Sequence, residues 1–182
     1  MWKKIANETY YHLVNAGPLV LVGTKTEQQI NFTPVAWISP LNDEPPLITL
    51  AIAADHFAAQ ALKKNPQLTI NLVDKKLLPL AWKCGKVSGK EIDKLKKFSI
   101  KTCPSEVIEV PGLADSPAII EGRIIDSREY AGVVLFIVRV LHSKVAKSLY
   151  DDYWLTDRAK IIHHVGGKYF ACLGKRFVVA EK

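Results

Sequence analysis

The chain has 182 residues, of which 48% are hydrophobic and 24% are charged, and its formal net charge is +7. This length suits one domain with a sizeable buried core, and the composition excludes a mainly disordered protein. The positive charge would suit an anionic partner, but the lysines lie in short runs such as Lys75-Lys76, without a long basic stripe interleaved with aromatic residues. We therefore expect a solvated basic surface rather than a nucleic-acid interface.

Membrane, disulfide and secretion signals are also missing. The longest apolar runs, Leu47–Ala54 and Ala131–Val138, are much shorter than the ~20 residues that a membrane-spanning helix needs. The three cysteines form no CxxC pair, which argues against a zinc knuckle or a disulfide framework. The start of the chain, Met1–Ile5, is not a basic segment followed by an apolar one. We expect a cytoplasmic protein with reduced thiols and no membrane contact.

The first predicted elements form a hairpin. Residues Ile5–Leu13 make a short lead-in, Pro18–Gly23 is a compact apolar run typical of a strand, and Thr24–Gln29 is a polar turn. The turn leads to Asn31–Pro34, which we interpret as a second polar turn with free backbone amides and one hydroxyl group. Together these segments should feed the centre of the fold.

Two short apolar segments, Val35–Ser39 and Leu47–Ala54, are predicted to be the central buried strands. A loop that contains Asn42, Asp43 and two prolines joins them, and the second segment runs into Asp55-His56-Phe57, where the pattern becomes helical. A strand entered through a polar turn, beside a strand that leads into a helix N-terminus, can hold an anionic ligand.

The rest of the chain alternates short helices with strands. Asp55 is the predicted N-cap of a helix over Phe57–Lys64. The later expected elements are a strand at Leu68–Val73, a helix at Leu77–Lys83, a glycine-containing loop at Cys84–Gly89, a helix at Lys90–Phe98, an irregular stretch at Ser99–Gly112, strands at Ala118–Ser127 and Val133–Lys144, a polar linker at Asp151–Lys160, and β structure at Ile161–Val165 and Lys168–Leu173. This order predicts a mainly β protein, an antiparallel barrel with short helical insertions in one domain spanning residues 1–182.

Common catalytic motifs do not occur. The chain contains no GxGxxG, GxxxxGK[ST], HExxH or GxSxG pattern. His163 and His164 are adjacent on a predicted strand, so they point to opposite faces and cannot chelate one metal ion together; we expect no metal site. Cys84 precedes a predicted helix and could be a reactive thiol, although a buried, inert cysteine is commoner. Ser88-Gly89 before Glu91 is locally typical of a helix cap.

Several short motifs, each weak alone, occur in an order that resembles one family. They are Asn15-Ala16-Gly17-Pro18 with Leu19–Val22, Pro34–Leu41, Pro45-Pro46-Leu47 with Ala51-Ile52-Ala53, Asn71, Trp82–Gly85, Ser88–Lys94 and His164–Phe170. The chain resembles the flavin reductase-like family of FMN-binding split β-barrels, including the flavoredoxin type, nearly from end to end. The resemblance implies a homodimer with FMN near the subunit interface and NAD(P)H as the hydride donor.

The same resemblance implies which residues bind FMN. Asn31, Thr33, Pro34, Val35, Ala36 and Trp37 would line the flavin ring and ribityl chain; Ala51, Ala53, His56, Phe57 and Ala58 would approach the phosphate; Ser88, Gly89 and Lys94 would close the pocket; and His164 and Tyr169 would approach from the C-terminal segment. Of these, His164 is the one candidate for a catalytic role. Hydride transfer depends mainly on positioning, so the sequence need not supply a dedicated acid or base.

Three functions stay open. The first is a reductase that passes hydride from NAD(P)H to FMN and electrons onward to a free flavin, a ferric chelate or a redox partner protein. The second is a flavoredoxin-like electron carrier that uses NAD(P)H poorly. The third is a barrel that has lost FMN and acts as a binding or scaffold protein, because His56, Phe57 and Ala58 stand where relatives place a cationic residue and a threonine.

Overall fold

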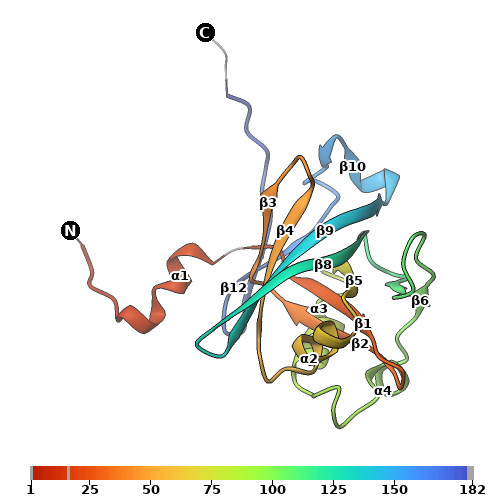
Figure 1. The fold of residues 1–182 in the computed structure, drawn as a ribbon. Coiled ribbons are helices and arrows are strands. Elements are labelled where there is room, and N and C mark those ends of the chain that lie inside the picture. The colour runs from red at the N-terminus through yellow and green to blue at the C-terminus, as the bar shows by residue number, and fades with distance from the viewer. Residues whose placement is uncertain (1, 16, 180–182) are drawn as a thin grey trace.

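The protein, described here by a computed structural model that covers residues 2–15 and 17–179, is built around one antiparallel sheet (Figure 1). Seven strands pair in the order β2-β1-β5-β8-β9-β4-β3. Their bounds are Val20–Lys25 (β1), Ile30–Val35 (β2), Ile38–Asn42 (β3), Leu47–Ala53 (β4), Gln67–Leu72 (β5), Ala118–Tyr130 (β8) and Val133–Val145 (β9). The strands predicted at Ala118–Ser127 and Val133–Lys144 are present as β8 and β9, and they pair as an antiparallel hairpin.

The ends of this sheet are tied together by the chain itself. Strands β2 and β3 lie at opposite edges of the sheet, yet only Ala36 and Trp37 separate them in sequence. A two-residue connection can span only about 10 Å, so the two edges must meet at this point. The sheet is consequently curled into a barrel whose seam passes through Trp37. There the Ala51 N–H donates to the Trp37 carbonyl at 2.9 Å.

The other elements are short and surround the barrel. They are the helices Tyr11–Val14 (α1), Phe57–Lys64 (α2), Leu78–Gly85 (α3) and Lys94–Phe98 (α4), the 3-10 turns Asn7–Thr9 (η1) and Lys147–Leu149 (η2), and the strand pairs Thr102–Cys103 with Gly112–Leu113 (β6, β7), Tyr150–Asp151 with Tyr153–Trp154 (β10, β11) and Ile162–Gly166 with Tyr169–Cys172 (β12, β13). In Figure 1, α1 and the C-terminal stretch extend away from the barrel. Within the described residues, none of the helices could cross a membrane.

Two hydrophobic cores flank the first strands, because β1 is buried on both faces. Val20 and Val22 point into the barrel, where α2 contributes Ala58, Ala59 and Leu62 to the same cluster. Leu19 and Leu21 point outward and form a second cluster with Phe32 of β2 and with α3. This second cluster fixes α3 on the outside of β2, next to the crossing at Trp37.

The predicted polar turn at Asn31–Pro34 is wrong. These residues form most of β2 and pair with β1, with Asn31 opposite Thr24 and Pro34 opposite Leu21. The Nδ2 of Asn31 donates a hydrogen bond to the Oγ1 of Thr33 at 2.9 Å. Both of these polar residues are therefore buried inside a strand. Pro34 is tolerated because β2 is an edge strand, where a missing N–H breaks no ladder bond. Likewise, Val35–Ser39 is two strands on opposite edges rather than one.

Three local predictions also need correction. Helix α2 is capped by His56 rather than Asp55, without a side-chain capping bond. The helix predicted from Lys90 begins at Lys94, because the Asp93 carboxylate accepts the N–H of Lys96 and caps it there. Ser88 accepts the N–H of Lys90 in a turn instead of capping that helix. The predicted linker at Asp151–Lys160 contains the hairpin β10–β11.

Candidate functional site

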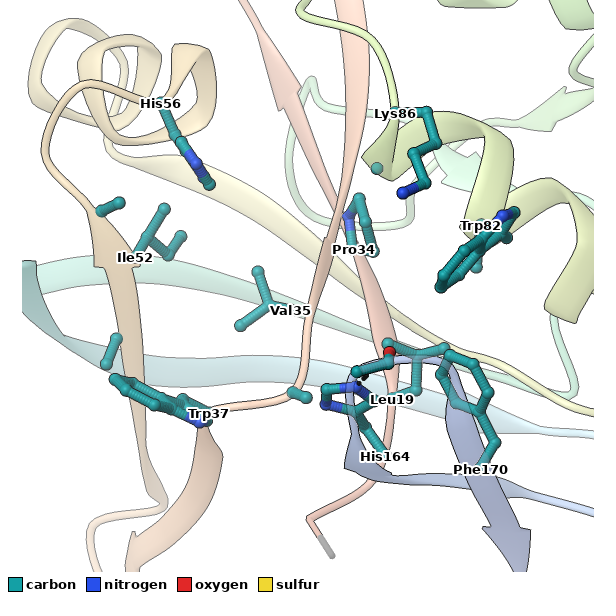
Figure 2. A pocket seen from close by; sticks show the side chains of 16 residues that line it. Leu19, Pro34, Val35, Trp37, Ile52, His56, Trp82, Lys86, His164 and Phe170 are labelled. Carbon is teal, nitrogen blue, oxygen red and sulfur yellow. Dashed lines mark hydrogen bonds between the residues drawn. The ribbon is translucent and has the colours of Figure 1, made fainter. Parts of the chain in front are cut away.

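A hollow of about 530 Å³ lies at the barrel seam, between the sheet and α3 (Figure 2). Pro34 and Val35 form its floor, and β4 contributes Ala51–Ala53. The opposite wall comes from Trp82 of α3 and from the β12–β13 hairpin, which brings in His164 and Phe170. We call this space the first hollow. Its volume is in the range of small-molecule sites in proteins.

Aromatic rings bound the first hollow on both sides. Trp82 stands edge to face with Phe170, at 6.1 Å between ring centroids, and the Nζ of Lys86 lies 4.5 Å from the Trp82 ring. Phe170 in turn contacts the ring of His164 at 5.2 Å. Trp37 stands at the other end and is 48% exposed, so its indole is available to a ligand rather than buried in the core. This arrangement suits a flat, largely apolar ring system.

A second hollow of about 460 Å³ continues from the first. The two share Pro34, His56, Gly85 and Lys86, and Figure 2 shows His56 and Lys86 on opposite sides of the first hollow. The second hollow adds Lys90 and Lys94. Among the described residues that line it, Asp55 is the one acidic residue. An elongated ligand would thus pass from an apolar slot into a cationic end.

Lys94 is buried beside the second hollow and joins its two sides. Its Nζ donates to the carbonyl of Phe32 in β2 at 3.1 Å and to that of Cys84 in α3 at 2.8 Å. Burial lowers the pKa of Lys94, although the nearby Cys84 opposes the shift. Burial also raises the pKa of the Cys84 thiol, with Lys94 opposing it. Cys84 is therefore a buried, protonated thiol, and the reactive alternative is not supported.

The turn at Ser88-Gly89 closes the second hollow against β2. A Cβ at Gly89 would lie 2.5 Å from the Oδ1 of Asn31 and 3.0 Å from the Phe57 ring, so a larger residue would push the turn outward. The Gln29 side chain holds the same turn by donating to the Gly89 carbonyl. The Oδ1 of Asn31 is buried and has no hydrogen-bond partner among the described residues.

The structure brings most of the predicted site residues to the two hollows. The first is lined by Pro34, Val35, Ala36, Trp37, Ala51, Ala53, His56 and His164. The second is lined by Thr33, Phe57, Ser88, Gly89 and Lys94, besides Pro34 and His56. Three predicted residues line neither: Asn31 is buried behind Gly89, Ala58 is fully buried in the barrel core, and Tyr169 is 67% exposed on the hairpin. A direct ligand contact is therefore not indicated for these three side chains.

Sequence reasoning did not assign Trp82, Lys86 and Phe170 to the site. Trp82 and Phe170 belong to motifs that supported the family resemblance, but nothing local shows that α3 and β13 meet beside the seam. The orientation of His164 is also a tertiary feature, because its Nε2 lies 3.1 Å from the carbonyl of Gly167, whose φ of +54° makes the tight turn possible. Within the described residues, no three metal-ligating side chains form a cluster.

Comparisons with known proteins match this geometry. The family model described as "Flavin reductase like domain" matches residues 13–163. Among curated proteins, the uncharacterized protein YddH of Escherichia coli (strain K12) is 27% identical over 173 residues, which are 90% of each chain. The flavoredoxin of Desulfovibrio vulgaris (Miyazaki F) has a TM-score of 0.87 at 21% identity and covers 99% of this chain and 97% of its own.

A second solved structure, an FMN-binding protein from Thermus thermophilus with bound p-hydroxybenzaldehyde, has a TM-score of 0.83 at 20% identity, and 99% of each chain is covered. At such identities, the solved structures establish the fold rather than the ligand. They confirm the expected split barrel with few short helices.

Proposed function

Because the match over residues 13–163 shows that the chain belongs to the flavin reductase-like domain family, we propose that it binds FMN and reduces it with NAD(P)H. Electrons would then pass to a free flavin, a ferric chelate or a protein acceptor. An oxidoreductase is the activity that the family supports. FMN as cofactor, NAD(P)H as donor and the nature of the acceptor are parts of the proposal.

One observation carries the proposal: the two hollows adjoin at four shared residues, and their linings change from apolar in the first to cationic in the second. FMN has the same polarity, with a flat ring at one end and a phosphate dianion at the other. Within the described residues, the first hollow contains no Asp or Glu, whereas His56 and Lys86 stand where it joins the second. The donor set therefore fits an anion held by charge-assisted hydrogen bonds. When bound, FMN supplies the two-electron and one-electron chemistry.

The chain's own residues would chiefly position the ligands. Trp37 and Trp82 border the slot and would contact a bound ring, together with Pro34 and Val35. Lys86 would offset part of the phosphate charge, and the His56 ring would offer a hydrogen bond beside it. This division of roles leaves the reaction dependent on orientation rather than on an acid or base.

His164 is the residue that could handle a proton. If its Nε2 donates to the Gly167 carbonyl at 3.1 Å, its Nδ1 is left for a ligand in the first hollow. That nitrogen accepts a hydrogen bond in the neutral ring and donates one in the imidazolium. His164 thus stays a candidate for contact with the flavin edge or the nicotinamide, with no assigned catalytic step.

The test is an absorption spectrum of the purified protein before and after anaerobic addition of NADH or NADPH. The proposal predicts a bound-flavin spectrum that bleaches on addition and returns with air. A flavin spectrum that persists would reject NAD(P)H turnover and favour an electron carrier. Absence of flavin even after incubation with FMN would reject the cofactor and favour a barrel used for binding alone.

The third function has a specific structural point in its favour. Phe57 lines the second hollow and Ala58 is in the barrel core, so neither position offers a hydroxyl group or a charge to a phosphate. Lys86 and Lys90 line the same hollow and could replace the missing charge.

We also propose that the protein is a homodimer, on the basis of the family resemblance. Light scattering after size exclusion would test this proposal, because it measures the mass of the assembly.

A further inference from the structure

A third hollow, of about 460 Å³, lies on the other side of Trp37 from the first. Tyr11 and Val14 of α1 line its edge, and its base is the outer face of the sheet, including Thr49 and Leu135. Ala36, Trp37 and Ala51 line both the first and the third hollow. The indole of Trp37 therefore separates two spaces, one on each side of the barrel seam.

The third hollow differs from the second in charge. Its lining within the described residues contains no Lys, Arg, His, Asp or Glu. The polar side-chain groups there are hydroxyl groups, the indole N–H of Trp37 and one amide, and the Thr49 hydroxyl is already used as a donor to the Ser39 carbonyl at 3.2 Å. An ionised ligand would lose its hydration without gaining a counter-charge, so the space favours a neutral compound.

The amide belongs to Asn15 and lacks a partner. Its Nδ2 is buried and has no hydrogen bond within the described part of the chain, while the Asn15 main-chain N–H is fixed by the Tyr11 carbonyl at 2.7 Å. A buried donor left unpaired is unfavourable, because it has lost its hydrogen bonds to water without gaining others. Rotation of this short side chain at the wall would let a ligand oxygen accept its N–H, which removes that penalty.

Aromatic rings meet at the same wall. Tyr11 and Trp37 stand nearly edge to face, with centroids 6.2 Å apart and an interplanar angle of 64°. Such walls favour a planar ring over a branched aliphatic compound. We propose that the third hollow is a second small-molecule site that takes a neutral, planar aromatic compound with a carbonyl oxygen, held by the Asn15 amide. This site is separate from the FMN site and does not depend on it.

Coumarin is a suitable probe because it is neutral, planar and unreactive and has one carbonyl group. Naphthalene is its matched control, having the same two-ring shape without an acceptor. Isothermal titration of the protein should show one coumarin site, and saturation with FMN should not abolish it. Asn15→Leu should weaken coumarin about tenfold, the loss of one hydrogen bond, while leaving naphthalene affinity within about twofold.

A second variant tests the location. Leu135 pairs with Ala51 across the β4–β9 ladder. It lines the third hollow but not the first, so Leu135→Trp should fill the third hollow. This variant should lose both probes and keep the FMN affinity of the wild type, with circular dichroism as the folding check. If FMN has no site at all but the probe results hold, the proposed function fails and this inference stands.

Three outcomes would contradict the inference. Displacement of coumarin by FMN would place the probe in the first hollow. Absence of coumarin binding, together with a change from dimer to monomer in Leu135→Trp, would show that a second copy of the chain fills the third hollow. An Asn15→Leu protein that binds coumarin as tightly as the wild type would reject the role of the amide.

Discussion

The first hollow has two walls of different construction. One is the sheet wall, formed by β2 and β4, where Ile52 is 3% exposed and belongs to the barrel core. The other is the added wall, formed by α3 and the β12–β13 hairpin, where Trp82 is 42% exposed. The sheet wall therefore contributes to folding and binding at once. The added wall is free to determine which ligand is held.

The largest expected effect is on the sheet wall. Ile52→Ala should lower the free energy of unfolding by about 2–5 kcal/mol, because it leaves a cavity in the barrel core. Trp82→Ala on the added wall should lower it less, since much of its indole already faces solvent. Chemical denaturation of both variants measures the difference. Equal losses would show that the two walls are equally part of the core.

The next prediction concerns the residue that ties the walls together. Lys94→Met leaves the carbonyls of Phe32 and Cys84 without their donor, which should lower stability by about 2 kcal/mol after the gain from removing a buried charge. Lys83→Met, an exposed position on α3, is the control. An unchanged midpoint of denaturation in Lys94→Met would contradict this role.

The same pair of proteins has a predicted pH dependence. Burial lowers the pKa of Lys94 below the ordinary value of 10.5, so between the lowered pKa and 10.5 the unfolded chain binds more protons than the folded one. The stability of the wild type should accordingly rise relative to Lys94→Met as the pH increases across this window. A gap that narrows with rising pH would show the opposite shift.

Trp37 lies where both walls end, and its removal should affect binding more than folding. Trp37→Ala should weaken FMN binding by more than ~1 kcal/mol if the indole packs against the flavin. Trp2→Ala is the matched control, because Trp2 is fully exposed and does not line the first hollow. A folded Trp37→Ala protein with unchanged FMN affinity would mean that the indole serves packing alone.

The smallest effect is expected for the cation on the added wall. Lys86→Gln should weaken FMN by about 0.5–1 kcal/mol, and the loss should shrink at high salt because Lys86 is exposed. Riboflavin, which lacks the phosphate, should bind the variant and the wild type alike. If riboflavin is weakened as much as FMN, Lys86 acts through its contact with Trp82 instead.

The sequence predicts the sheet wall better than the added wall, for a physical reason. The local residue pattern predicts strands at Ala118–Ser127 and Val133–Lys144, which are β8 and β9, and the family resemblance points to Pro34–Trp37. The added wall depends on how α3 packs on β2, which no local pattern expresses. For the same reason the sequence does not reveal Lys86 as a site residue, and its local pattern predicts a turn at Asn31–Pro34 where the structure has a strand paired with β1.

The two-residue crossing at the seam links ligand binding to the opening motions of the barrel. The amide hydrogen of Ala51 is held by the carbonyl of Trp37 at the end of the β3–β4 ladder, so it can exchange with solvent deuterium only when the Trp37 segment separates from β4. A ligand that rests on Trp37 from either side would hold this segment against β4. Exchange at Ala51 should then slow on binding, and this one main-chain proton would report occupancy of both spaces that the indole divides.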